Sequence, residues 1–240
     1  MINNSFLIVL LLFHFIADFY FQSHKMALAK DENIKSLFIH CIIYLLTFSL
    51  LFIIYRNSWN LTFCVSLIGI SHFVVDFIKF IINLDTKLSK NFVFSLDQLI
   101  HILIILGIFY YFDKGLSFVS RFDLNSYLNT LKLTISVLII LKPTNIFIKS
   151  FFEESDNEVK EKRLGRIIGN LERLLITVLL LANQFVVIGY VFAAKSIARW
   201  KNFEERDFAE YYLIGTLLSV LVSIVIYFLF LYNNNILNMG

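Results

Sequence analysis

Long apolar runs separated by short charged or Asn-rich breaks dominate this sequence of 240 residues. Several runs reach about 18 residues or more, which is the length that crosses about 30 Å of hydrocarbon as an α-helix. The composition agrees, because 58% of the residues are hydrophobic and 16% are charged, and the mean hydropathy is +0.75. A lipid bilayer is therefore the expected solvent, and a soluble enzyme is excluded.

The runs predict an all-α, polytopic membrane helix bundle of about seven transmembrane helices. Transmembrane strands are excluded, because the runs are about twice as long as a barrel strand and do not alternate. Pro143 is expected to kink or end the fifth helix. We predict one membrane domain over 1–240, with a four-helix half (1–112) and a three-helix half (113–240). The predicted helices span 5–22, 36–55, 61–82, 92–112, 128–149, 167–194 and 209–232.

Lys and Arg in short loops favour the cytoplasmic side of a membrane. The loops after the first, third and fifth predicted helices are basic and share one side, so the amino terminus is expected outside the cytoplasm. The loop before the last helix disagrees, because its basic residues fall on the opposite side. The residues on the first side are Lys25, Lys30, Lys35, Lys79, Lys87, Lys90, Lys160, Lys162, Arg163 and Arg166, and those of the last loop are Lys195, Arg199, Lys201 and Arg206.

The first four helices contain a repeated motif. His14-Phe-Ile-Ala-Asp18 in the first helix recurs as His72-Phe-Val-Val-Asp76 in the third. The second and fourth helices each add a His within an apolar segment. We therefore predict a duplicated two-helix hairpin, with parallel repeats because two helices return the chain to its starting side.

Ionisable residues within these helices are costly in hydrocarbon. Each intramembrane Asp costs roughly 2.5 to 3.5 kcal/mol unless it is paired. Residues four apart share a helix face, and the helix directions bring all of these residues to the leaflet next to the Lys-rich loops. The expected neighbours are His14 with Asp18, His72 with Asp76, and Asp97 with His101, and His40 lies at the same depth.

Four His and three Asp at one depth match the imidazole and carboxylate ligands that Zn, Mn or Fe prefer. They suffice for one ion with supporting residues or for two ions. The alternative is that each His and Asp only satisfy one another by hydrogen bonds. We favour a functional site, because membrane cores rarely keep so many costly groups for packing alone. The predicted ligands are His14, Asp18, His72, Asp76 and His101.

Other polar residues near this leaflet receive supporting roles. Asp97 or His40 is expected to act as a general base or to orient a ligand. Arg173 could hold a phosphate, and Glu172 could neutralise the cluster, although a local ion pair at the interface explains both residues equally well. Gln22 and Gln98 extend the polar pattern, whereas Cys41 and Cys64 are interpreted as small buried hydrophobes.

The combined pattern resembles a bacterial membrane family catalogued as domain of unknown function 3307. The resemblance covers the first four and the last two predicted helices, and it implies a bacterial inner-membrane location and a shared polar site without a known activity. It rests on His14-x3-Asp18-x3-Gln22, His40, His72-x3-Asp76, Asp97-Gln98-x2-His101, Gly169-x2-Glu172-Arg173, Ala194-Lys195-Ser196 and Gly215-Thr216-x2-Ser219.

Three functions are compatible with this site. The first is a metal-dependent hydrolase acting on a lipid or prenyl phosphate at the cytoplasmic leaflet, with membrane lipid as the partner. The second is a transporter of protons or divalent cations, and the third is a non-catalytic membrane scaffold. A nucleic-acid partner is excluded, because the net charge is only +3 and no segment interleaves Arg with aromatic residues.

Overall fold

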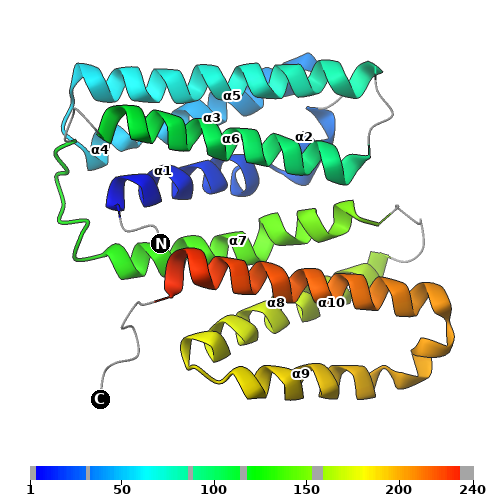
Figure 1. Cartoon of the computed structure of the whole chain (residues 1–240). Helices are drawn as coiled ribbons and strands as arrows, with labels where there is room; N and C mark the ends of the chain where they lie inside the picture. The colour runs from blue at the N-terminus through cyan, green and yellow to red at the C-terminus, as the bar shows by residue number, and fades with distance from the viewer. Residues whose placement is uncertain (1–3, 31–32, 86–88, 114–117, 153–158, 233–240) are drawn as a thin grey trace. The chain divides into compact units, whose positions relative to one another are not determined.

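A computed structural model describes residues 4–30, 33–85, 89–113, 118–152 and 159–232. In these residues the regular secondary structure consists of helices, with one isolated β-bridge (Figure 1). The chain divides into two compact units, Ile2–Leu131 and Lys132–Gly240. Among the basic residues used to orient the chain, Lys87 lies outside the described residues, as do the side chains of Lys25, Lys90, Lys160, Lys162 and Arg163.

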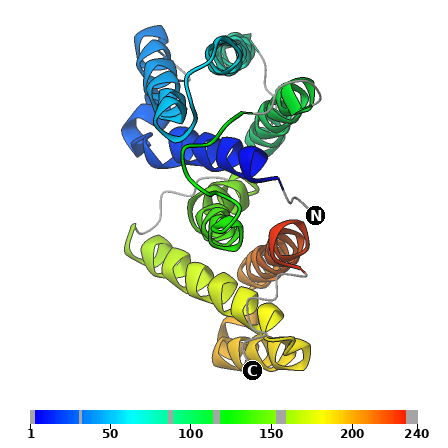
Figure 2. The same ribbon diagram turned by 90° about the vertical axis from the view of Figure 1, so that its left-hand side faces the viewer.

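The first unit is a ring of four long helices. α5 packs against both α3 and α6, and α1 closes the ring by contacting the same two helices, as the view in Figure 2 shows. These helices confirm the first four predicted segments. The elements are α1 (Ser5–Phe15), a π-helical turn (Ile16–Tyr20), α2 (His24–Ala29), α3 (Ile34–Ser49), α4 (Leu51–Ile54), α5 (Trp59–Asp85) and α6 (Lys90–Asp113).

Polar residues in the breaks between apolar runs set where these helices begin. The Asn4 side chain accepts hydrogen bonds from the backbone N–H groups of Phe6 and Leu7, at 2.9 and 3.3 Å. Asn33 caps α3 in the same way, through the N–H of Lys35 at 2.9 Å. Such side chains satisfy N–H groups that the first turn leaves unpaired, so each break defines a helix start.

One end of the first unit is closed by two paired loop segments. The N–H of Arg56 donates to the carbonyl of Val119 at 2.9 Å, and the N–H of Arg121 donates to the carbonyl of Ile54 at 2.8 Å. The ring of Phe6 packs edge-on against the buried Tyr55, with centroids 5.2 Å apart. These contacts join the loop after α4 to the segment after α6 and fix how the two hairpins meet.

The second unit contains α7 to α10, and α8 packs against both α9 and α10. α7 continues past Pro143 to Ser150, so the proline does not end it. Because proline has no N–H, the Ile139 carbonyl loses its usual partner, and the Thr144 hydroxyl donates to it at 2.7 Å. The elements are α7 (Leu128–Ser150), α8 (Val159–Leu181), α9 (Phe185–Ala198), a 3₁₀ turn (Trp200–Glu204), α10 (Arg206–Ile226) and a π-helical turn (Tyr227–Leu231).

The single helix predicted over 167–194 is wrong, because the segment forms two helices, α8 and α9, that run in opposite directions (Figure 1). Asn183 has a φ of 56°, a left-handed conformation that Asn tolerates better than most residues. The N–H groups of Gln184 and Asn183 then donate to the carbonyls of Leu179 and Leu180, at 2.8 and 3.1 Å. This pair of bonds is a Schellman motif, which ends α8 inside an otherwise apolar run.

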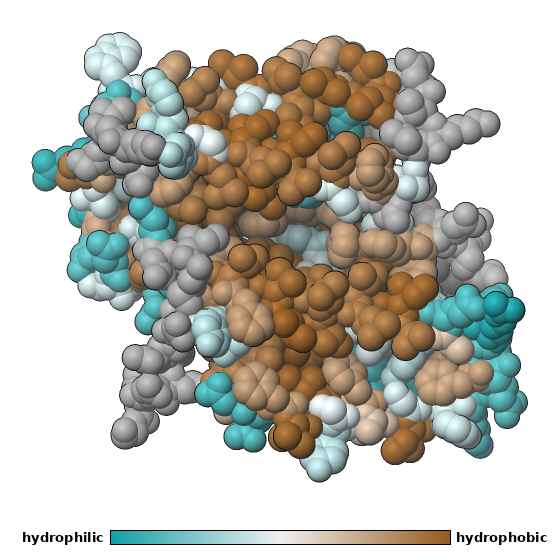
Figure 3. Space-filling model, viewed as in Figure 1, coloured by the Kyte–Doolittle hydropathy of each residue, from teal (hydrophilic) through white to brown (hydrophobic). Residues whose placement is uncertain are grey.

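Among the described residues, five helices are long and apolar enough to cross a membrane, which confirms the prediction of an all-α protein with membrane-spanning helices. Apolar side chains cover the outward faces of α5, α6 and α10 in Figure 3. Two further apolar helices, Ser5–Tyr20 and Phe185–Ala198, are shorter. The five are Ile34–Ile54, Trp59–Ile82, Phe92–Phe112, Leu128–Ser150 and Arg206–Leu231.

Candidate metal centre

All seven His and Asp residues predicted to form the cluster are buried in the first unit, each at most 5% exposed. α1 and its π-helical turn supply two of them, α3 supplies one, and α5 and α6 supply two each. Their side chains form a continuous set of contacts in the middle of the helix ring. The residues are His14, Asp18, His40, His72, Asp76, Asp97 and His101.

A first set of ligand atoms surrounds the facing imidazoles of His40 and His72. The two Nε2 atoms lie 3.1 Å apart. Asp18 Oδ1 lies 3.2 Å from His40 Nε2, and Asp76 Oδ2 lies 3.4 Å from His40 Nε2 and 3.6 Å from His72 Nε2. Two nitrogens and two oxygens from three helical segments, the π-helical turn, α3 and α5, therefore converge on one small volume.

A second set lies on the other side of the Asp76 carboxylate. Asp76 Oδ1 lies 3.3 Å from His101 Nε2, and the same nitrogen lies 3.4 Å from Asp97 Oδ1. Asp97 and His101 are one helical turn apart on α6, so the predicted pairing of these two residues is confirmed. Both sets include Asp76: its Oδ2 belongs to the first set and its Oδ1 to the second.

Asp18 does not pair with His14, which corrects the expectation from their spacing of four. Asp18 lies in the π-helical turn, where the wider turn changes the direction of its side chain. Its carboxylate instead reaches His40, and it accepts a hydrogen bond from Gln98 Nε2 at 2.8 Å. His14 Nδ1 lies 3.0 Å from the Tyr44 hydroxyl. His14 therefore lies beside the two ligand sets, with its ring 5.6 Å from that of His101.

Two lysines enter the cluster and were not predicted to do so. Lys30 follows α2 and is 7% exposed, and its Nζ lies 3.2 Å from Asp76 Oδ2 and 3.6 Å from Asp18 Oδ1. Lys79 on α5 lies 3.1 Å from Asp97 Oδ2. The sequence pattern places both in the cytoplasmic loops or at their edges. The long side chains allow a residue near the interface to reach a buried carboxylate, which residue spacing along the chain does not reveal.

Aromatic and sulfur side chains complete the surroundings of the first set. The Tyr44 ring stacks on His72, with centroids 3.5 Å apart and an interplanar angle of 4°. Cys41, predicted as a buried hydrophobe, is half-buried and has its Sγ within 4.8 Å of ligand atoms of His72 and Asp76. Tyr44 follows His40 by four residues, so helical spacing from His40 could have indicated it, whereas Cys41 at the next position has no such signal.

The two glutamines have different environments. Gln98 Nε2 bridges two carboxylates, because it donates to Asp18 Oδ2 at 2.8 Å and to Asp97 Oδ2 at 3.2 Å. Gln22 is buried beyond the π-helical turn. The Nδ1 atoms of His40 and His72 have no hydrogen-bond partner in the described structure. Gln98 thus connects the first ligand set to the second, as a supporting residue should.

Arg173 lies in the second unit, where neutral groups bind its guanidinium. Its Nε donates to the carbonyl of Ile140 at 2.9 Å, and its Nη1 donates to Ser219 Oγ at 3.2 Å. Its Nη2 donates to the side-chain oxygens of Asn145 and Asn170, at 2.6 and 2.7 Å. These four bonds join α7, α8 and α10 around one side chain that is 1% exposed.

Glu172 also belongs to the second unit, where Lys195 Nζ lies 2.5 Å from its Oε2. The same ammonium donates to Thr216 Oγ1 at 3.0 Å. Glu172 and Arg173 therefore have different partners. Glu172 forms a local ion pair, as the sequence allowed, and its partner is Lys195.

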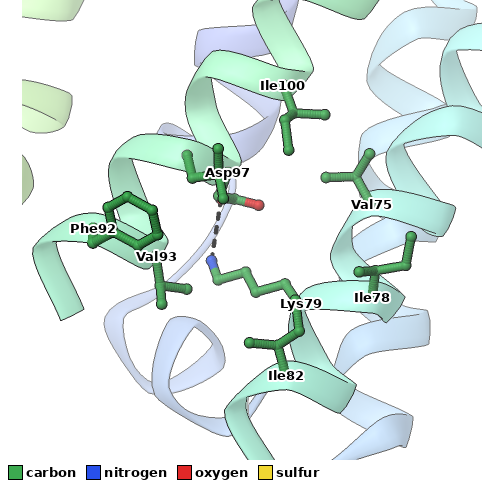
Figure 4. A pocket seen from close by; sticks show the side chains of 9 residues that line it. Val75, Ile78, Lys79, Ile82, Phe92, Val93, Asp97 and Ile100 are labelled. Carbon is green, nitrogen blue, oxygen red and sulfur yellow. Dashed lines mark hydrogen bonds and ion pairs between the residues drawn. The ribbon is translucent and has the colours of Figure 1, made fainter. Parts of the chain in front are cut away.

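An apolar groove of about 140 Å³ lies between α5 and α6 beside the second ligand set. Figure 4 shows Ile78, Ile82 and Phe92 lining the groove, with the Lys79–Asp97 ion pair at its wall. Lys79 and Asp97 are the only charged groups in this lining. The surface of the groove is almost wholly apolar, and the Lys79–Asp97 ion pair lies behind it, next to His101.

Comparison with known proteins supports the resemblance noted in the sequence. The family described as Protein of unknown function (DUF3307) matches residues 6–131. This segment coincides with the first structural unit and contains the whole His and Asp cluster. No curated protein and no solved structure matches the chain. Because the match covers half of the chain, this protein belongs to the DUF3307 family.

Proposed function

We propose that the first unit is a metal-dependent hydrolase that acts on a lipid or prenyl phosphate at the cytoplasmic leaflet. The observation that carries the proposal is the convergence of His40 Nε2 and His72 Nε2, 3.1 Å apart, with carboxylate oxygens of Asp18 and Asp76 at 3.2 to 3.6 Å. The expected ion is Zn, Mn or Fe, since imidazole and carboxylate ligands together suit these metals.

The spacing of these atoms fits ligands around an ion. Zn–N and Zn–O bonds of about 2.0 to 2.2 Å place neighbouring ligand atoms about 3.3 to 3.5 Å apart in a tetrahedron and roughly 3 Å apart in an octahedron. Three distances in the first set, 3.1, 3.2 and 3.4 Å, fall between these two spacings or within the tetrahedral one, and the distance from Asp76 Oδ2 to His72 Nε2 is slightly longer at 3.6 Å. In the described structure Asp18 Oδ1 has no hydrogen-bond partner, and its charged neighbours are His40 Nε2 at 3.2 Å and Lys30 Nζ at 3.6 Å. A buried carboxylate oxygen of this kind is suited to a cation.

The groove between α5 and α6 supports a lipid substrate. Its lining by Ile78, Ile82 and Phe92 suits an acyl or prenyl chain that reaches it directly from the bilayer. The Lys79 ammonium lies behind this apolar lining, paired with Asp97 at 3.1 Å, and it would bind a phosphate oxygen only if the substrate displaced that pair. A substrate bound in this way would bring its phosphate next to Asp97 and His101.

The proposed reaction is hydrolysis of the phosphate ester. An ion in the first set would make a bound water acidic enough to supply hydroxide near neutral pH. The water oxygen forms a bond to phosphorus while the bond between phosphorus and the lipid oxygen breaks. Asp97 takes one water proton and returns it to the lipid alkoxide, so the products are a lipid alcohol and inorganic phosphate.

The α8–α9 hairpin supports the proposed orientation. Because α8 and α9 run in opposite directions, the α9–α10 turn lies at the same end of the second unit as the start of α8 (Figure 1). The basic residues around this turn then belong with the other Lys-rich loops on the cytoplasmic side, and the disagreement found in the sequence disappears. We therefore propose an inner-membrane protein of bacterial type with its amino terminus outside the cytoplasm.

We also propose a revised count of crossings. The five long helices and Ser5–Tyr20 cross the bilayer, whereas α8 and α9 form a hairpin that enters and leaves on one side. The seven apolar segments predicted from the sequence thus become six crossings and one hairpin. Equivalent contacts in the two helix pairs support the duplicated hairpin. Asp18 contacts His40 in the first pair, and Asp76 contacts His101 in the second.

The test is metal analysis joined to a phosphatase assay. Protein purified in detergent is expected to contain bound Zn, Mn or Fe and to release phosphate from prenyl phosphate or phosphatidic acid in mixed micelles. His72→Ala should lose both properties, whereas Asp123→Asn, which changes an exposed acid bonded to Ser126, should keep both. A folded wild-type protein that binds none of the three metals would overturn the proposal.

A metal-free role is the second candidate, and the ion pairs of Lys30 and Lys79 favour it. These lysines neutralise carboxylates of the cluster without any ion. The protein would then be a scaffold, or a transporter passing protons along the contacting imidazoles of His40 and His72. A proton flux into proteoliposomes that His72→Ala abolishes would support the transporter, and wild-type stability in that variant would support the scaffold.

A further inference from the structure

Asp76 places one carboxylate oxygen in each ligand set. Its Oδ2 faces His40 and His72, at 3.4 and 3.6 Å. Its Oδ1 faces His101 Nε2 at 3.3 Å, and the same nitrogen meets Asp97 Oδ1 at 3.4 Å. Each oxygen of one carboxylate therefore belongs to a separate group of potential ligands. A carboxylate in this position can bridge two ions.

The second set fits an ion by the same criteria as the first. Its distances of 3.3 and 3.4 Å equal the separation of neighbouring ligands in a tetrahedral site, about 3.3 to 3.5 Å. Asp97 Oδ1 is buried and accepts no hydrogen bond. Lys79 and Gln98 both contact the other oxygen, Oδ2, at 3.1 and 3.2 Å, so they leave Oδ1 open toward His101. Each set thus contains one buried oxygen that lacks a hydrogen-bond partner.

The two helix pairs contribute to the sets in the same way. In the first pair an Asp on the leading helix contacts a His on the following helix, Asp18 with His40 at 3.2 Å. In the second pair the corresponding contact joins Asp76 and His101 at 3.3 Å. A duplicated hairpin that holds one ion in each copy would produce this arrangement.

We propose that the cluster binds two divalent cations, one held by Asp18, His40 and His72 and the other by Asp97 and His101, with Asp76 bridging them. This inference rests on the proposed function and specifies its site. Two-ion centres typically hold their metals about 3.5 to 4 Å apart and clamp the attacking and leaving oxygens of a phosphate ester. Asp97 would then be a ligand instead of a base, so the proton lost by the attacking water would pass to solvent, and solvent would supply the proton that converts the lipid alkoxide into the alcohol.

The charges of the cluster suit two ions together with a phosphate. The cluster contains three buried carboxylates, and Lys30 and Lys79 contact them. Two divalent cations carry more charge than the three carboxylates even if Lys30 is displaced, so an anionic phosphate ester would be attracted to the centre. Lys79 and Asp97 both line the groove between α5 and α6, so the second ion would be the one nearer to a substrate in this groove.

The experiment is a manganese titration of the detergent-purified chain, with bound metal measured after gel filtration and spin coupling measured by electron paramagnetic resonance. We expect two Mn²⁺ per chain and an exchange-coupled spectrum. His101→Ala should retain one Mn²⁺ and show an uncoupled spectrum, and Asp123→Asn should match the wild type. The wild-type spectrum decides the question even if a variant fails to fold.

The outcomes separate the inference from the function on which it rests. One uncoupled Mn²⁺ per wild-type chain, with phosphatase activity present, would overturn the two-ion centre and leave the hydrolase standing. Two coupled ions without hydrolysis of any lipid phosphate would support the centre and overturn the proposed substrate class. A folded wild-type chain that binds none of Mn²⁺, Zn²⁺ and Fe²⁺ would overturn both.

Discussion

The ammonium nitrogen of Lys30 lies 3.2 Å from Asp76 Oδ2, the same oxygen that faces His40 and His72. A lysine and a metal ion cannot use the same lone pairs of this oxygen at once. An ion in the first ligand set therefore has to displace the Lys30 ammonium, which follows the six-residue helix α2. Metal affinity at this set should depend on how readily Lys30 leaves.

Lys30→Met is expected to tighten Mn²⁺ or Zn²⁺ binding by roughly tenfold or more, because it removes a competing charge worth at least about 1.4 kcal/mol. Isothermal titration in detergent measures the change. Lys35→Met is the matched control, since Lys35 is exposed just inside α3, and it should leave the affinity within about twofold. Weaker binding in Lys30→Met would show that the lysine supports the ion instead of competing with it.

Arg173→Lys is expected to lower the free energy of unfolding by about 2 to 4 kcal/mol, because one ammonium cannot replace four hydrogen bonds made through three guanidinium nitrogens. Thermal unfolding in detergent measures the loss. Arg206→Lys is the control, because Arg206 is 89% exposed and pairs only with Glu210 one turn away. Its effect should stay below about 0.5 kcal/mol. Equal effects of the two substitutions would contradict the role given to Arg173.

Gly169→Ala and Gly165→Ala are expected to act in opposite directions, although both glycines lie on α8 in a small-x3-small pattern. A Cβ at position 169 would lie 3.3 Å from Arg173 Nη1, so the guanidinium would have to shift within its hydrogen bonds. A Cβ at position 165 meets nothing within 4 Å. Gly165→Ala should therefore stabilise the helix by up to about 1 kcal/mol through helix propensity.

Differential scanning fluorimetry in one detergent compares these two variants with the wild type. A lower melting temperature for Gly169→Ala and an equal or higher one for Gly165→Ala is the expected order. The reverse order would mean that Gly165 and not Gly169 faces a close neighbour.

The orientation can be tested with single cysteines in a chain whose Cys41 and Cys64 are replaced by alanine. Lys201→Cys is expected to react with an impermeant maleimide only in inverted membrane vesicles, as Lys35→Cys does, because the α8–α9 hairpin returns the chain to its starting side. Arg121→Cys should react in intact cells. Labelling of Lys201→Cys together with Arg121→Cys in intact cells would contradict the hairpin topology.

The apolar runs predicted most of the helices, because length and hydropathy alone decide whether a segment can cross hydrocarbon. The segment 167–194 is the exception, because hydropathy does not reveal the turn that divides it into α8 and α9. The break at Asn183 depends on one positive φ and two backbone hydrogen bonds, with apolar residues on both sides. Average hydropathy hardly changes across such a turn, so a hairpin and a long helix have the same profile.

The cluster could be predicted because buried His and Asp are costly in a bilayer, and all seven residues do converge. Their partners could not be predicted in full. The π-helical turn directs Asp18 toward His40 instead of His14, and ideal α-helical spacing cannot anticipate this. Lys30 reaches Asp76 across 46 positions of sequence. Arg173 was expected to bind a phosphate, yet neutral oxygens on three helices bind its guanidinium.

The turn at Asn183 has a consequence for membrane insertion. If the segment were one long helix, the strongly basic stretch from Lys195 to Arg206 would have to be translocated through hydrocarbon, where each Lys or Arg costs roughly 2.5 to 3.5 kcal/mol at the bilayer centre. The reversal of direction removes that step, because the insertion machinery only has to accept a short hairpin from the side on which the chain is made. A three-residue turn thus spares the nascent chain the translocation of a loop with four basic residues.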